Sequence, residues 1–197
     1  RILPEIHQKG LKVITNAGGV NPQACREKLL RLSKESGYPI KIGVIRGDDI
    51  YSDLQKLRDR GVCFDNMDTG KSFNEIADKV YSANVYINSF TISEALEKGA
   101  QIVLAGRVSD PGLALGPCAY EFKWKNKEYD KIAAGTLAGH IIECGAQCTG
   151  GNYSQWQEVP DMANLGYPII EISSDGKFCI TKHEGTGGLV TRETVAE

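Results

Sequence analysis

Residues 11–45 decide the fold, and they read LKVITNAGGVNPQACREKLLRLSKESGYPIKIGVI. Two short apolar, β-rich runs, at 11–15 and 40–45, flank a segment in which leucines recur among charged residues, as in an amphipathic helix. Asn21 and Pro22 are typical of the N-cap and first position of a helix, and Gly37 is typical of its end. The stretch therefore predicts a strand, a loop at 16–21, a helix and a second strand.

The cycle of strand, polar loop, helix and glycine recurs along the first half of the chain. A helix at 1–9 precedes it, and the later elements that we expect are a loop at 46–49, helices at 52–60 and 72–80, a β-rich run at 83–90, a helix at 94–98 capped by Thr91 or Ser93, a strand at 101–105 and a loop at 106–111. Alternating strands and helices are typical of βαβ units. We therefore expect an α/β fold with a mostly parallel sheet flanked by helices, Rossmann-like in its layers.

The pattern changes after Gly112. We expect helices at 113–122 and 129–148, then a C-terminal β-hairpin around Asp175-Gly176, because Asp-Gly between apolar runs is a strong hairpin signal. A glycine-rich loop and the start of a helix at 189–196 follow. The expectation is a single α/β domain over 1–197, with a βαβ core at 1–112 and a helical segment, hairpin and glycine-rich loop at 113–197.

Composition excludes several classes of function. The 197 residues carry a net charge of −2, so no basic field attracts nucleic acid or anionic lipid. No apolar run approaches the roughly 18 residues that a membrane span needs. The six cysteines are scattered without a CxxC pair, which predicts reduced thiols and a cytoplasmic location. The chain begins at Arg1 without Met and stops at Glu197 inside a predicted helix, so we expect a piece of a longer protein.

Polar loops follow three of the predicted strands. Ligands of open α/β sheets bind outside the carboxyl ends of the strands, so we expect these loops to form a site. The candidate residues are Asn16, Gly18, Gly19 and Asn21 in the first loop, Arg46, Gly47, Asp48 and Asp49 in the second, and Gly106, Arg107, Ser109 and Asp110 in the third. Adjacent side chains diverge, so only one of the paired aspartates is expected to face the site and the other to cap the next helix. Arg107 would clamp a carboxylate or phosphate, or would form an ion pair with Asp110.

A second group of candidates lies on the predicted helix 129–148. His140, Glu143 and Cys144 stand at i, i+3 and i+4, which places them on one face of a helix. A histidine beside a carboxylate can act as acid and base, and a histidine beside a cysteine can activate a thiolate. The alternative is a histidine that simply finds a hydrogen-bond partner in the core.

The glycine-rich loop 185–188 is a candidate anion cradle. Its backbone amides, unobstructed by side chains before a helix, could hold a phosphate or carboxylate, with His183 at the rim. The candidate residues are Gly185, Thr186, Gly187 and Gly188, with Asn152 beside a second glycine pair at 150–151. The alternative is a tight turn in which Thr186 or Thr191 caps the next helix. No Walker A loop and no GxGxxG fingerprint occurs.

Several long motifs carry a family resemblance. They are, in order, TNAGGVNP at 15–22, GDD at 47–49, GRVSD at 106–110, GHIIECGAQ at 139–147, TGGN at 149–152 and KHEGTGGLV at 182–190. Together these motifs resemble the acyclic terpene utilisation protein family over nearly the whole chain. The resemblance implies a role in the breakdown of citronellol- and geraniol-type acids, which are handled as coenzyme A thioesters. It also implies chains that extend further on both sides.

We therefore expect an enzyme of acyclic terpene or branched-chain acid catabolism that acts on an acyl-CoA or small carboxylate, of lyase or hydratase type. His140, Glu143, Asp48 and His183 are the candidate catalytic residues. No cofactor is identified, and coenzyme A enters only as part of a thioester substrate. A homo-oligomer is compatible with the sequence. The alternatives are a non-catalytic ligand-binding or partner-stabilising subunit, and a metal-dependent hydrolase drawing three ligands from the same four residues.

Overall fold

The computed structural model describes residues 1–19 and 21–197, so Val20 of the predicted loop 16–21 lies outside the described residues. The chain divides into two compact units. Unit 1 comprises Arg1–Asn88 and Gly99–Val108, and unit 2 comprises Ser89–Lys98 and Ser109–Glu197. Among the described residues, no helix is long and apolar enough to cross a membrane.

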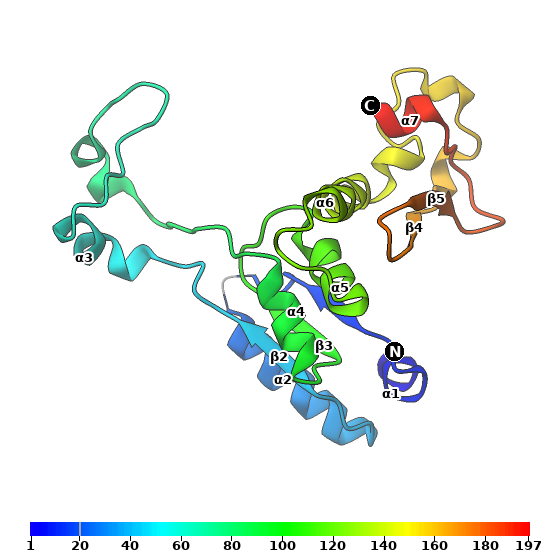
Figure 1. The fold of residues 1–197 in the computed structure, drawn as a ribbon, viewed down its shortest axis with the longest axis horizontal. Helices are drawn as coiled ribbons and strands as arrows, with labels where there is room; N and C mark the ends of the chain where they lie inside the picture. Colours follow the sequence, from blue (N-terminus) through cyan, green and yellow to red (C-terminus); the bar gives the residue numbers. More distant parts are fainter. Residues whose placement is uncertain (20) are drawn as a thin grey trace. The chain divides into compact units, whose positions relative to one another are not determined.

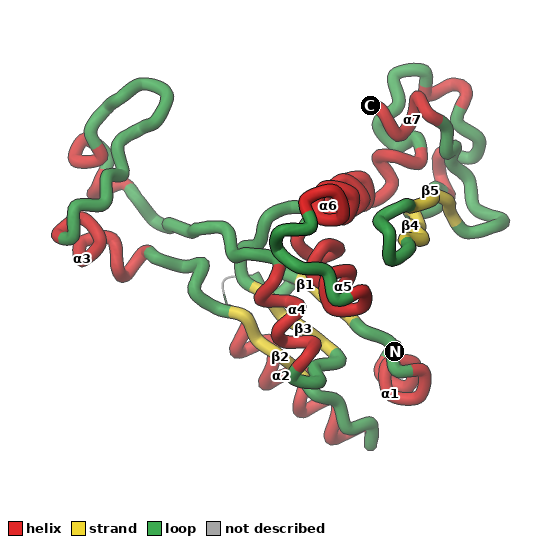
Figure 2. The backbone as a smooth tube through the Cα atoms, in the orientation of Figure 1, coloured by secondary structure: helices red, strands yellow, loops and turns green. Residues whose placement is uncertain are grey.

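Unit 1 is built on a parallel three-stranded sheet, which Figures 1 and 2 show with its strands side by side. The strands are β1 (Val13–Thr15), β2 (Ile42–Ile45) and β3 (Ile102–Ala105), in the order β1-β3-β2. Every residue of the central strand β3 is buried, and its continuous apolar sequence is typical of a central parallel strand. The expected α/β fold is confirmed.

Two helices cover one face of this sheet. Ile6 of α1 (Leu3–Lys9) packs in one cluster with Ile102 and Leu104 of β3, and Leu29 of α2 (Pro22–Ser36) packs against the same cluster. The Asn21 side chain accepts the backbone N–H of Ala24 at 3.0 Å, so Asn21 caps α2 as predicted. Helix α1 ends at Gly10 and α2 ends at Gly37, and both glycines adopt the left-handed conformation.

Between β2 and β3 the chain forms an excursion over residues 51–82, which we call the arm. It contains α3 (Leu54–Asp59) and short 3₁₀ turns at Tyr51–Asp53, Phe73–Glu75 and Ala77–Lys79. The rings of Phe64 and Phe73 lie 5.7 Å apart, and the Arg58 guanidinium lies 5.3 Å from the Phe73 ring. The predicted helix at 72–80 is wrong, because these 3₁₀ turns replace it and the Asp65 carboxylate accepts the Phe73 N–H.

The predicted β-rich run at 83–90 is also wrong. Its backbone donors go to different partners: the Val85 N–H to the Asp48 carbonyl at 2.8 Å, and the Ile87 N–H to the Arg107 carbonyl at 2.9 Å. Isolated bridges replace a ladder. Helix α4 (Phe90–Glu97) begins at the last residue of that run, four residues before the expected start at 94, so the predicted caps at positions 91 and 93 lie inside the helix.

Unit 2 begins with packed helices. Helix α5 (Gly112–Phe122) packs against both α4 and α6 (Tyr129–Glu143), and its residues Leu115 and Ala119 form a core with Trp124. Strands β4 (Pro168–Ile172) and β5 (Phe178–Lys182) form the predicted antiparallel hairpin. The Trp124 indole N–H donates to the Ser174 carbonyl at 2.9 Å, which ties the hairpin turn to this core.

Two helix boundaries in unit 2 differ from expectation. The predicted helix 129–148 ends at Glu143, because Gly145 adopts a left-handed φ of 58° and the chain continues as a 3₁₀ turn at Gly145–Thr149. Further 3₁₀ turns lie at Trp156–Glu158 and Met162–Asn164. The last helix, α7 (Arg192–Ala196), begins after Thr191, whose hydroxyl accepts the Thr194 N–H in a capping box.

Candidate functional site

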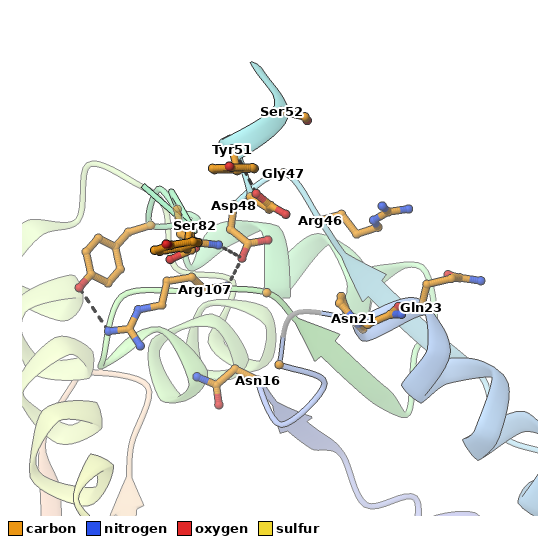
Figure 3. Close-up of a pocket in the computed structure, with 17 residues that line it drawn as sticks. Asn16, Asn21, Gln23, Arg46, Gly47, Asp48, Tyr51, Ser52, Ser82 and Arg107 are labelled. Atoms are coloured by element: carbon orange, nitrogen blue, oxygen red, sulfur yellow. Dashed lines mark hydrogen bonds between the residues drawn. The ribbon is translucent and has the colours of Figure 1, made fainter. Parts of the chain in front are cut away.

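The loops that follow β1, β2 and β3 line one cleft of about 1150 Å³ within unit 1. Figure 3 shows its labelled residues. The predicted ligand residues that line this cleft are Asn16, Gly19, Asn21, Arg46, Gly47, Asp48, Asp49, Gly106 and Arg107. Residue 18 instead packs against Pro22, where a Cβ would approach to 2.9 Å of the proline Cα. The three strand ends thus bring their polar side chains to one place, as the topology of a parallel sheet requires.

Asp48 is the residue that joins the walls of the cleft. One oxygen of its carboxylate, Oδ2, accepts the backbone N–H of Arg107 at 2.7 Å and the side-chain amide of Asn84 at 3.1 Å. Its own carbonyl accepts the Val85 N–H at 2.8 Å. The dashed lines in Figure 3 show the two carboxylate contacts. Asp48 therefore fixes the loop after β2 to the loop after β3 and to the end of the arm.

Gly106 is what allows this contact. A Cβ at residue 106 would lie 2.0 Å from the Asp48 Oδ1 atom, a distance that no real side chain could tolerate. The glycine N–H donates to the Ile45 carbonyl at 3.1 Å, which continues the pairing of β2 with β3 into the loop. The glycine directly after a buried strand thus serves the approach of a carboxylate to the backbone.

Arg107 extends into the cleft from the end of β3. Its guanidinium donates to the Tyr86 hydroxyl at 3.2 Å and lies 5.0 Å from the centre of the same ring. An arginine held by an aromatic ring and a hydroxyl loses less rotamer entropy when it binds an anion. The expected role of Arg107 as an anion clamp fits this position. Asp110, its alternative partner in an ion pair, belongs to unit 2.

The second aspartate of the pair has a different task. Asp49 Oδ1 accepts the Tyr51 N–H at 3.0 Å, at the start of the arm, while Asp48 is turned to Arg107. The expectation that only one aspartate faces the site and the other caps the next helix is wrong, because both line the cleft and the Asp49 contact with Tyr51 is not a helix cap. Both carboxylates already accept backbone N–H groups, and Arg46 lies in Figure 3 on the side of Asp48 away from Arg107.

Several cleft residues were missed by the sequence reasoning. They are Pro22 and Gln23 at the start of α2 and Tyr51, Ser52, Tyr81, Ser82, Asn84 and Tyr86 of the arm and its base. A signal for two of them exists: the alternation of Val85 and Ile87 places Asn84 and Tyr86 together on the opposite face. The rings at 51 and 81 carry no such signal, because the arm has no regular period.

The group at the end of α6 lies in unit 2. His140, Glu143 and Cys144 are all exposed. The Cys144 thiol donates to Glu143 Oε2 at 2.8 Å, and this contact with a carboxylate raises the pKa of the thiol above its ordinary value. A thiol that keeps its proton is a poor nucleophile. The hypothesis of an activated Cys144 thiolate is therefore not supported by this geometry.

The glycine-rich loop of unit 2 donates two of its amides to the protein itself. The Gly187 N–H binds the Asn164 carbonyl at 2.8 Å, and the Gly188 N–H binds the Pro160 carbonyl at 2.8 Å. At the start of the loop, Gly185 has a left-handed φ of 72° and the Thr186 hydroxyl donates to the His183 carbonyl at 2.6 Å. The tight turn, weighed above as an alternative to an anion cradle, is the geometry that the structure shows, with Thr191 as the helix cap.

The remaining candidates of unit 2 are His183, Asn152 and Asp110, and all three are exposed. A Cβ on either glycine before Asn152 would clash, at residue 150 with Val159 at 2.9 Å and at residue 151 with the Ala146 carbonyl at 2.8 Å. These glycines therefore serve packing. Within the described residues, His, Cys, Asp and Glu side chains form no group of three that could hold a metal ion.

Comparison with known proteins adds one finding. The model of the acyclic terpene utilisation family, described as "Acyclic terpene utilisation family protein AtuA", matches residues 1–197. This is essentially the whole chain, and it confirms the resemblance carried by the motifs. No curated protein and no solved structure matches the chain.

Proposed function

The chain belongs to the acyclic terpene utilisation family AtuA, and from this membership we propose that it is an enzyme that binds an acyl-CoA or small carboxylate in the cleft of unit 1. The family gives the broad role, which is the utilisation of acyclic terpenes. The substrate and the reaction are our proposal. A lyase or hydratase acting on a branched acyl thioester or acid agrees with the lack of a dinucleotide fingerprint in the sequence.

One observation carries this proposal: the loops after all three parallel strands converge on a single cleft with Arg107 in it. Arginine presents a planar fork of donors that matches a carboxylate or phosphate. Arg107 is oriented by Tyr86, and its backbone is held by Asp48. An anionic head group bound by Arg107 would also lie within the cleft that Asn16 and Arg46 line.

The residues of the cleft support a role in ligand binding better than they support a particular proton transfer. Asp48 holds the backbone of Arg107, so we assign it to positioning rather than to acid–base chemistry. The candidate proton carriers are then His140 with Glu143, and His183, all of unit 2. Histidine and glutamate are frequent general acids and bases, and on that chemistry we propose them as the proton carriers of the reaction.

The test is a binding titration of the chain with short-chain acids, coenzyme A and acyl-CoA thioesters. Binding is measured by calorimetry or by the thermal stabilisation of the chain. Saturating ligand at 100 times its Kd should stabilise the fold by about 2.7 kcal/mol. Arg107→Ala should weaken binding by about tenfold or more, the loss expected for a charge-assisted hydrogen bond of 1.5–3 kcal/mol.

Arg31→Ala is the matched control, because Arg31 is an exposed arginine of α2, in the same unit, and does not line the cleft. It should bind like the unchanged chain. Binding that ignores Arg107→Ala, or no stabilisation by any compound of the panel, would reject this assignment of the cleft.

A second candidate is a non-catalytic subunit that binds the ligand or stabilises a partner enzyme. The observation that favours it is the lining of the cleft, which includes no His, Glu or Cys among the described residues. The two candidates separate in one measurement. If the chain binds ligand and turns it over, and a His140→Ala, His183→Ala double variant loses the turnover, the enzyme is supported. If the chain binds ligand without any turnover, the non-catalytic subunit is supported.

A further inference from the structure

Three tyrosines line the cleft although much of each side chain is left to water. The exposed fractions are 47% for Tyr51, 90% for Tyr81 and 64% for Tyr86. A tyrosine can bury roughly 150–250 Å² of surface, and clustered exposed apolar surface marks a binding region. Tyr86 has a partner in Arg107. The rings of Tyr51 and Tyr81 are the part of this surface that the proposed anion clamp does not use.

Tyr51 and Tyr81 both belong to the base of the arm, where its two ends meet. Tyr51 begins the arm and Tyr81 lies next to its last residue, and the Ile50 N–H binds the Ala83 carbonyl at 2.9 Å between them. The bridge between residues 49 and 84 holds the same base together. Figure 3 shows Tyr51 on the arm side of Asp48, whereas Asn16 lies on the side of the sheet. The cleft therefore has a polar side at the strand ends and an aromatic side at the arm.

The cleft is larger than a small anion would fill. Sites for drug-sized ligands measure about 300–1,000 Å³, and this open cleft measures about 1150 Å³. A carboxylate on Arg107 would leave most of that volume to water. A ligand that joins an anionic group to a larger apolar group would fill both sides.

We propose that Tyr51 and Tyr81 form an apolar subsite, which binds the hydrocarbon part of an acyl ligand whose anionic group, the carboxylate of a free acid or the phosphates of a coenzyme A thioester, lies at Arg107. This rests on the proposed function. Hydrocarbon fits the arm side better than the nucleotide of coenzyme A does, because that nucleotide carries phosphates and needs cations. The arm residues that line the cleft beside the two rings are Ser52 and Ser82, which are uncharged.

The experiment compares acyl chain lengths on the full 197-residue chain. Acetyl-CoA, octanoyl-CoA and free coenzyme A are titrated by calorimetry into the unchanged chain and into Tyr81→Ser and Tyr51→Ser. Each methylene buried on the rings should tighten binding about fourfold, so octanoyl-CoA should bind at least tenfold more tightly than acetyl-CoA. Tyr81→Ser should remove most of that difference and leave the affinity for acetyl-CoA within twofold.

Tyr129→Ser is the matched control. Tyr129 is 72% exposed at the start of α6 and does not line the cleft, so its loss should leave the chain-length difference intact. Both tyrosines are so exposed that neither substitution should affect folding.

The outcomes separate the two proposals. Equal affinities for acetyl-CoA and octanoyl-CoA overturn the apolar subsite but leave the anion clamp standing, as long as Arg107→Ala weakens both ligands. If Tyr81→Ser weakens the binding of all three ligands equally, free coenzyme A included, the rings stack on the nucleotide. This result also overturns the subsite. Binding of none of the ligands overturns the proposed function together with the subsite.

Discussion

Two regions of this chain are rich in glycine and have different tasks. In unit 1, the loops after β1, β2 and β3 open onto a cleft and present the side chains of Asn16, Asp48 and Arg107. In unit 2, the loop 185–188 folds against its own unit and donates the amides of Gly187 and Gly188 to backbone carbonyls. Both regions look like ligand loops in the sequence.

The difference lies in what the glycines meet. Around Gly19 and Gly47, a Cβ would find nothing within 4 Å. At Gly187, a Cβ would lie 2.1 Å from the Asp161 carbonyl oxygen. Close backbone approach can serve a ligand or the protein itself, and the space around each glycine distinguishes the two. The Gly19 and Gly106 amides of unit 1 also donate to carbonyls, those of Asn16 and Ile45, so this unit offers a ligand the side chains around its loops, whereas the loop in unit 2 is packed against its own backbone.

The largest effect should come from Gly187→Ala. The new methyl group would have to displace the backbone at Asp161, so we expect a loss of about 3 kcal/mol in the free energy of unfolding. Gly19→Ala is the comparison: its φ of 54° costs the alanine about 1 kcal/mol, with open space around the methyl group. Urea denaturation of both variants measures the difference.

This comparison fails if Gly187→Ala is no less stable than Gly19→Ala. A mild effect at residue 187 would mean that the backbone at Asp161 does not lie against this glycine in solution. The loop would then be available for an anion, and the cradle would again be the better interpretation.

The second effect concerns the residue that joins the walls of the cleft. Asp48→Ala removes the acceptor of the Arg107 N–H and of the Asn84 amide, and hydrogen bonds to a charged group are worth about 1.5–3 kcal/mol each. Because Asp48 is partly exposed, we expect a loss of about 2 kcal/mol in all. Asp48→Asn keeps an acceptor oxygen and should recover about half. Both are measured by urea denaturation.

Asp49→Ala is the control for this pair, because it removes only one exposed hydrogen bond, from the Tyr51 N–H, and should cost less than about 1 kcal/mol. Equal losses at the two aspartates would show that the contact across the cleft has no special weight. The Asp48→Ala variant should also bind ligand more weakly than the unchanged chain, because the Arg107 backbone loses its hydrogen-bond acceptor.

The sequence predicts the regular parts of this fold and the place of the site. The strands, the cap at Asn21 and the hairpin at Asp175-Gly176 follow from local periodicity and turn chemistry. The convergence of strand-end loops follows from parallel topology. The arm does not, because its conformation depends on contacts such as Phe64 on Phe73, and these join residues without any period. Nor does the sequence show whether the amide of Gly187 faces a ligand or a carbonyl.

A smaller effect on stability is expected at Asn21, which lines the cleft and caps α2. Asn21→Ala should lower the free energy of unfolding by about 1 kcal/mol, the usual cost of losing an N-cap, and Asn21→Ser should restore most of it. Thermal denaturation without ligand measures both. Asn152→Ala, at the corresponding exposed asparagine of unit 2, should change stability by less than about 0.5 kcal/mol. A cap variant that is fully stable yet loses ligand binding would make Asn21 a ligand contact first.

The smallest effect is expected in the reactivity of Cys144, which tests whether unit 2 contains a reactive thiol. The Glu143 carboxylate accepts the thiol proton and raises the pKa of Cys144, so the reactive thiolate should form only at higher pH than for an ordinary cysteine. Alkylation by iodoacetamide at pH 8, followed by peptide mass spectrometry, should therefore be slower at Cys144 than at the exposed Cys179. Glu143→Gln removes the negative charge, lowers the thiol pKa and should speed alkylation severalfold, whereas His140→Ala should not. The opposite result, with rapid alkylation at neutral pH that His140→Ala abolishes, would restore the activated thiolate and place a reactive group in unit 2 as well as a binding cleft in unit 1.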